Sequence, residues 1–96
     1  MQQYVAVGRL TKDPKLTYTD KAKCTFFLAV EERKGSFNRV DYIPCVAWRE
    51  LGELIANYTQ KGKLVSVKGS LRSHQYEENG KSKMRYELEV HECDFY

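Results

Sequence analysis

The stretch DYIPCVAWREL, residues 41–51, has apolar side chains on both sides of a predicted strand. Side chains of a β-strand alternate between its two faces. One face carries apolar side chains with two aromatic rings among them: Val40, Tyr42, Pro44, Val46 and Trp48. The opposite face carries Ile43, Cys45 and Ala47. A small domain needs one apolar face per strand for its core, so the second face needs a different explanation.

Length and composition predict one small domain, residues 1–96, without enzymatic or metal-binding motifs. Cys24, Cys45 and Cys93 are far apart with no CxxC pair, and neither His74 nor His91 stands at ligand spacing from a cysteine. No phosphate-binding loop, nucleophile elbow or HExxH motif is present. We therefore expect no cofactor, no metal and no catalysis. With no signal peptide or long apolar run, the sequence predicts a cytoplasmic protein outside the membrane.

Charge is unevenly distributed along a chain whose net charge is +3. Residues 61–85 contain seven Lys or Arg and two Glu, a local charge of +5. Residues 86–96 contain four acidic side chains and no Lys or Arg, a local charge of −4. This segregation indicates either a basic surface that meets an anion or two ordinary solvated faces.

Periodicity and turn signals predict five strands and one helix. The strands are expected at residues 4–10, 22–33, about 40–48, 63–76 and 82–95, and the helix at 49–60. Hairpin turns are expected at KGSFN, residues 34–38, and at Asn79-Gly80. This order predicts an all-β protein, a five-stranded Greek-key barrel of the OB-fold type with one α-helix between strands three and four. Gly69, in mid-strand, predicts a bulge, and Gly52 costs the helix roughly 1 kcal/mol.

The predicted strands place aromatic rings beside basic side chains. In the fourth strand, Tyr76 shares a face with Lys68, Arg72 and His74, opposite an apolar face. For residues 41–48 two assignments are open, because either of the two apolar faces can fill the barrel. In one of them Tyr42 and Trp48 point outward, and in the other they are core residues. Pro44 lacks an N–H, so the strand near it is expected to be an edge or a bulge.

Outward aromatic rings among cations suit an unpaired nucleic-acid strand. Every base has a π-face on which a ring can stack, a contact worth roughly 1 to 3 kcal/mol per base. Lys and Arg between the rings neutralise phosphates, which makes such binding salt-dependent. In a duplex the bases stack on one another and cannot meet the rings. The pattern therefore predicts binding to single strands.

Several segments, taken in order, resemble one known family. They are YVAVGRLTKDPKLTYT, TFFLAVEER, DYIPCVAWREL, ANYTQKGKLVSVKGSLRSHQYEENGK and YELEV. Together they resemble the bacterial single-stranded-DNA-binding proteins of replication, recombination and repair. The resemblance implies an OB-fold that assembles as a homotetramer, with a dimer as the alternative, and binds single-stranded DNA without sequence preference. It implies stacking by Tyr42, Trp48 and Tyr76. A fourth family aromatic falls on Lys34, and Phe37, three residues on, is the candidate to replace it, so whether Phe37 stacks is left open by the sequence.

Phosphate contacts without base readout are expected from basic side chains on the strands and hairpins. We call these residues the cationic set: Arg9, Lys12, Arg33, Lys34, Arg39, Arg49, Lys61, Arg72, Lys81, Lys83 and Arg85. The alternative for each member is a solvated surface side chain. As a set they outline a path for the strand.

Two departures and two rival functions accompany this resemblance. Family members usually continue into a flexible tail with an acidic tip that recruits replication proteins, whereas this sequence ends at Asp94-Phe95-Tyr96, so recruitment through such a tip is not expected. The sequence is then either a naturally short form or a shortened version. The hairpin after Glu32 is also shorter than usual.

Two rival functions remain open. One is a primosomal replication protein, an OB subunit acting mainly through protein partners. The other is a protein-interaction module whose aromatics bury against a protein surface.

Overall fold

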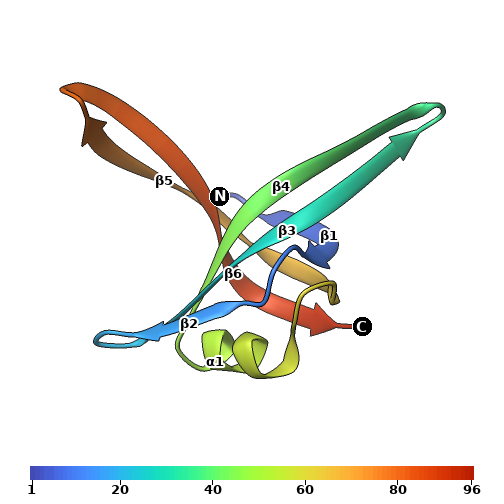
Figure 1. Ribbon diagram of the computed structural model, residues 1–96, viewed down its shortest axis with the longest axis horizontal. Coiled ribbons are helices and arrows are strands. Elements are labelled where there is room, and N and C mark those ends of the chain that lie inside the picture. Colours follow the sequence, from blue (N-terminus) through green and yellow to red (C-terminus); the bar gives the residue numbers. More distant parts are fainter.

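The computed structural model describes residues 1–96 and contains six β-strands and one α-helix (Figure 1). The strands are β1 (Tyr4–Leu10), β2 (Lys15–Tyr18), β3 (Ala22–Lys34), β4 (Phe37–Trp48), β5 (Leu64–Glu78) and β6 (Lys81–Phe95). The helix α1 (Arg49–Tyr58) lies between β4 and β5 and covers one end of the barrel. The structure contains no helix that is long and apolar enough to cross a membrane.

Five of the strands close into a barrel, which confirms the predicted OB-fold architecture. Around the ring the order is β1, β5, β6, β4 and β3, and a short pairing of β3 with β1 completes it. All neighbours are antiparallel except β4 and β6, which pair in parallel through Cys45 with Leu88 and Val46 with Glu89. Pro44 stands immediately before this parallel contact, where the β6 side of β4 is unpaired, and this agrees with the edge position expected from its missing N–H.

The sixth strand, β2, was not predicted. It pairs with the start of β3, Lys15 with Thr25 through Tyr18 with Ala22, outside the closed ring. Its four residues contribute a single apolar side chain to the core, Leu16, so they show no strand periodicity of their own. Because of β2, the helix expected between strands three and four lies between strands four and five. The helix also ends at Tyr58, two residues before the predicted end, because the backbone of Thr59 is extended, with φ −126° and ψ 162°. The Thr59 Oγ1 donates to the Ile55 carbonyl at 2.6 Å and so caps this end.

The barrel interior holds one compact cluster of small and medium side chains. Its members are Leu10, Cys24, Phe26, Leu28, Cys45, Ala47, Ile55, Val65, Val67, Leu88 and Val90. Of seven Tyr, four Phe and one Trp, only Phe26 is buried. Cys45 and Ala47 are in the core and Ile43 packs against it, which assigns this face of β4 to the barrel interior. Val46 on the other face is also buried, so that face reaches solvent at Tyr42 and only partly at Trp48. Tyr42 and Trp48 lie on the opposite, outer side of the strand.

The three cysteines are part of this packing. Burial raises the pKa of Cys45 to about 12, and the pKa values of Cys24 and Cys93 to about 11. All three are free thiols. Since a thiol with such a pKa stays protonated near neutral pH, these side chains act as small apolar groups.

Two glycines allow backbones to approach more closely than a side chain permits. At Gly69 the β5–β6 register shifts, as predicted for a bulge, and a Cβ there would lie 1.9 Å from the Glu89 carbonyl oxygen. At Gly52 a Cβ would lie 2.6 Å from the Ala47 carbonyl oxygen. The helix thus accepts the conformational cost of Gly52 because this position rests directly on the end of β4.

Two hairpin arms extend from the barrel and diverge like the limbs of a V (Figure 1). The β3–β4 arm turns at Gly35-Ser36 with a Gly35 φ of 64°, and the β5–β6 arm turns at Asn79-Gly80 with φ of 54° and 76°. Positive φ at both central residues is the signature of the tight turn predicted for Asn-Gly. Every residue of 31–40 and of 72–86 is exposed. The arms therefore contribute surface and no core.

We predict that Gly52→Ala lowers the free energy of unfolding by about 1 to 3 kcal/mol, because the added methyl group clashes with the Ala47 carbonyl. Elsewhere in a helix this change stabilises by roughly 1 kcal/mol. Asn57→Ala, at an exposed position of α1, is the matched control and should stabilise by a few tenths of a kcal/mol. Urea unfolding of both variants checks the signs. A Gly52→Ala variant as stable as Asn57→Ala contradicts the proposed close contact.

Candidate nucleic-acid interface

The outer face of β3 and β4 presents two of the predicted stacking residues. Trp48 pairs across the sheet with Lys23, and Tyr42 pairs with Ala29, six residues along each strand. Tyr42 is 65% exposed. Trp48 is half-buried and lies outside the core cluster, at the end of β4 where it forms the N-cap of α1. Both rings thus stand on the barrel surface.

Two lysines of β3 and its preceding turn lie over the indole of Trp48. The Nζ of Lys21 is 4.5 Å from the ring centroid and the Nζ of Lys23 is 5.4 Å from it. A cation over the face of Trp is attracted by the ring quadrupole. Neither lysine belongs to the cationic set expected from the sequence. Strand alternation could have identified Lys23 as a neighbour of the stacking residues. Lys23 is on the same face of β3 as Thr25 and Phe27, and this strand pairs with residues 41–48.

Arg49 has a strained backbone at the junction of β4 and α1. Its φ is +59°, in the left-handed region that costs non-glycine residues roughly 1 to 3 kcal/mol. The side chain is exposed and directly follows Trp48 in the chain. This strain turns the chain from the strand into the helix without a glycine, and a basic side chain is retained beside the indole.

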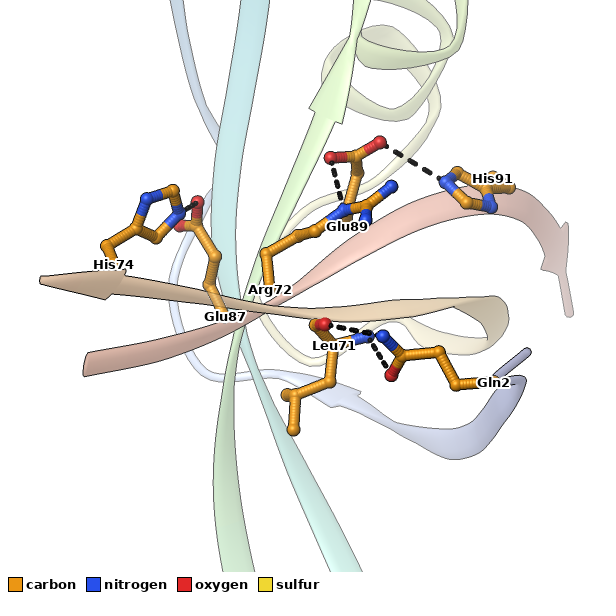
Figure 2. A network of polar contacts seen from close by, with 7 residues as sticks. All are labelled: Gln2, Leu71, Arg72, His74, Glu87, Glu89 and His91. Carbon is orange, nitrogen blue, oxygen red and sulfur yellow. Dashed lines mark hydrogen bonds and ion pairs between the residues drawn. The ribbon is translucent and has the colours of Figure 1, made fainter. Parts of the chain in front are cut away.

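The β5–β6 arm carries Tyr76 among basic and acidic side chains. Tyr76 is 41% exposed and pairs across the arm with Lys83. On the same face the Arg72 Nε donates to Glu89 at 3.2 Å, and the His74 Nε2 lies 2.8 Å from a Glu87 oxygen (Figure 2). The acidic segment 86–96 therefore lies beside the basic segment 61–85. Charges that are separate in the sequence are neighbours in the fold, which reduces the net positive charge of this face.

The cationic set divides into paired and unpaired members. The paired ones are Arg33 with Glu31, Arg39 with Asp41, Arg72 with Glu89 and Lys83 with Glu78, at 3.1 to 3.6 Å. The members with no ion pair are Arg9, Lys12, Lys34, Arg49, Lys61, Lys81 and Arg85. Of these, Arg9 and Lys61 line one shallow hollow near the start of β5, and Arg9 donates to the Gly62 carbonyl at 3.0 Å. Lys34 and Lys81 stand at the tips of the two arms.

The whole chain, residues 1–96, matches the Single-strand binding protein family. The chain belongs to this family. It is 42% identical over 95 residues to the single-stranded DNA-binding protein of Clostridium tetani, a match that covers 94% of this chain and 65% of that protein. It is 41% identical over 95 residues to single-stranded DNA-binding protein 2 of Clostridium acetobutylicum, covering 94% and 71% respectively. The Bacillus cereus protein is 44% identical over 82 residues, covering 80% and 48%.

The chain thus spans about half to two thirds of the length of these relatives. A solved structure of the Plasmodium falciparum SSB in complex with single-stranded DNA has the same fold, with a TM-score of 0.91. That likeness covers 100% of this chain and 95% of the other, at 22% sequence identity. The family and the fold expected from the sequence are both confirmed.

Phe37 does not share a face with the other aromatic residues of its arm. It is 58% exposed and pairs with Lys34 next to the turn. Counting along β4, it has the parity of Ile43 and Cys45, whereas Tyr42 and Trp48 have the other. Of the four rings expected to stack, the structure therefore places Tyr42 and Trp48 on one surface, Tyr76 on the second arm and Phe37 at the tip of the first arm.

Polar contacts hold the base of the second arm to the barrel. Glu89 bridges Arg72 and His91 (Figure 2). Its Oε2 accepts from Arg72, and its Oε1 lies 3.2 Å from the His91 Nε2. The Gln2 side chain donates to the Leu71 carbonyl at 3.0 Å and accepts from the Leu71 N–H at 3.2 Å. Gln2 thus continues the β1–β5 ladder with its side-chain amide.

We predict that Glu89 contributes to stability above about pH 4.3, the usual pKa of a glutamate. Partial burial acts to raise the pKa of Glu89, but hydrogen bonds from Arg72 and His91 outweigh it and lower the pKa overall. A carboxyl with a lowered folded-state pKa stabilises the fold above its unfolded pKa, and this contribution is lost as the pH falls through the folded pKa. Urea midpoints at pH 7 and pH 3 should therefore differ less in Glu89→Gln than in the wild type. Glu77→Gln, which removes an exposed and unpaired carboxylate, should leave the difference unchanged.

Proposed function

We propose that this chain binds and protects single-stranded DNA without sequence preference, in replication, recombination or repair. The observation that carries the proposal is the outer surface of β3 and β4, where Tyr42 and Trp48 lie outside the core and two lysines lie over the indole. A surface of this kind offers rings for stacking and cations for phosphates, which is what an unpaired strand needs. Family membership and the names of the relatives support it.

The proposed roles follow the side-chain chemistry. Tyr42, Trp48 and Tyr76 stack on bases, and Phe37 stacks on a base that reaches the arm tip. The cationic set contacts phosphates, and its unpaired members do so at least cost because they need not leave a carboxylate.

We propose a cytoplasmic location, because the names of the bacterial relatives give single-stranded DNA as their ligand. The family's description names binding and no reaction, which agrees with the expectation that the chain is not an enzyme.

We also propose that the chain self-associates into a homotetramer, with a dimer as the alternative. β1 pairs with β5 along Tyr4–Arg9 but meets β3 only at Arg9 and Leu10, so the first part of β1 has a free edge. Val5 and Val7 on this strand are 62% and 51% exposed. A free edge with apolar side chains is a natural site for a second copy of the same strand.

Replacing a stacking ring should weaken DNA binding and leave the fold intact. We expect Trp48→Ala and Tyr76→Ala each to cost about 1 to 3 kcal/mol of binding free energy, the value of one stacked base. Anisotropy of a labelled poly-thymidine strand, over a salt series, measures it. Affinity should fall steeply with salt. Tyr58→Ala, which removes an exposed ring on α1, is the control and should bind as the wild type does. Binding that is insensitive to salt would favour a protein-interaction module, and weak DNA binding beside tight binding to a protein would favour the primosomal rival.

A charge on β1 should dissociate the assembly. We expect Val7→Glu to reduce the mass measured by sedimentation equilibrium to that of a smaller species, because like charges would meet across a paired edge. Leu54→Glu, at a position of α1 that is 41% exposed, is the matched control and should leave the mass unchanged. A wild-type chain that sediments as a monomer contradicts the proposed self-association.

A further inference from the structure

A hollow lies where the two arms leave the barrel, between β4 and β6. The residues that line it include Phe27, Pro44, Cys45, Arg85, Tyr86 and Glu87. Its volume is about 310 Å³, within the range of sites that hold small molecules. It begins just beyond the parallel contact of Cys45 with Leu88, where β4 and β6 separate. Its lining comes from β3, β4 and β6.

Two aromatic side chains of this hollow have no structural task that explains them. Phe27 and Tyr86 are each 53% exposed and belong to neither the core cluster nor the residues packed against it. The Tyr86 hydroxyl contacts only the Met84 sulfur, at 3.0 Å. One half-exposed ring needs no explanation, but two that line the same hollow form an apolar surface that a ligand can cover.

The hollow is continuous with the face that carries Tyr42 and Trp48. Phe27 pairs with Pro44, and the next residue pair on the same face is Ala29 with Tyr42. Two residues along a strand span about 6.6 Å, so Phe27 and Tyr42 lie side by side on one surface. A strand whose base stacks on Tyr42 can therefore reach Phe27 with a neighbouring base.

The charges around the hollow favour a nucleotide over a purely apolar partner. Arg85 has no carboxylate partner, so its guanidinium is available for a phosphate or a base edge. The carboxylate of Glu87 is engaged by His74 at 2.8 Å on the arm. The ring of Pro44 adds an apolar surface opposite Phe27 without adding an N–H. Apolar rings with one free cation match the face of a base and its phosphate.

We propose that this hollow, which Tyr86 also lines, binds one further base of the single strand, stacked on Phe27. The inference rests on the proposed function and extends it to a subsite that neither Tyr42, Trp48 nor Tyr76 forms. It makes the base of the arms part of the path that the strand follows from the first arm to the second.

Conservative changes at Phe27 separate stacking from packing. Phe27→Leu keeps the apolar bulk and removes the ring, whereas Phe27→Tyr keeps the ring. For a labelled poly-thymidine strand we expect Phe27→Leu to bind about 5- to 150-fold more weakly, the loss that corresponds to one stacked base, and Phe27→Tyr to bind as the wild type does. Tyr58→Ala is again the control for loss of an exposed ring. Urea unfolding shows whether each variant is folded.

The outcomes distinguish this subsite from the function on which it rests. If the wild type binds and Phe27→Leu binds equally well, the subsite is overturned and the proposed function stands. If the wild type does not bind, both fall. If Phe27→Leu does not fold, Tyr86→Leu gives the same test, because Tyr86 belongs to an exposed arm and its ring is outside the core. Equal losses in Phe27→Leu and Phe27→Tyr also overturn the proposal, since stacking requires only the ring.

Discussion

The narrow interior of a five-stranded barrel is the constraint on which the rest of this structure depends. Barrel diameter grows with strand number, so few strands leave room only for small and medium side chains. The cluster inside contains Cys24, Cys45 and Ala47, and Phe26 is its one aromatic ring. Rings that would be core residues in a wider protein are therefore placed outside. The double apolar pattern of residues 41–48 agrees with this constraint: one face fills the barrel, and the other buries Val46 between Tyr42 and Trp48.

Exposed aromatic rings without charges around them would favour non-specific association with other proteins. The charged side chains around these rings restrict which partners the surface can accept. Lys21 and Lys23 lie over Trp48, and ion pairs such as Arg72 with Glu89 run along the second arm. Exposed pairs of this kind contribute little to stability. In the proposed function their effect would be on recognition, because a polyanion would compete with the protein's own carboxylates for the same cations. We therefore expect the balance between paired and unpaired basic residues to set the binding strength.

Much of the fold could be predicted from the sequence because its signals are local. Alternation marks β3 and β5, Asn79-Gly80 marks the hairpin, and Gly69 marks the bulge, and each is a property of a few neighbouring residues. β2 was missed because four residues with one core side chain have no periodicity, and only their pairing with β3 makes them a strand. The site was less accessible, since the lysines over Trp48 and the pairing of acidic with basic segments depend on cross-strand register. From the sequence, Gly52 was expected only to destabilise the helix. The structure shows why a glycine is needed there, because the Ala47 carbonyl of β4 leaves no room for a side chain.

The parallel contact between β4 and β6 is only two residue pairs long, yet both arms leave the barrel beside it. The two arms diverge from this contact and are not paired with each other beyond it. Beyond Cys45 and Leu88 no pairing joins β4 to β6, so a bend within either arm moves its tip the furthest. Since no residue of 31–40 or 72–86 is buried, such a bend disturbs no core contact of these residues. The gap between the arms can therefore adjust its width to whatever lies within it, at little cost to the barrel.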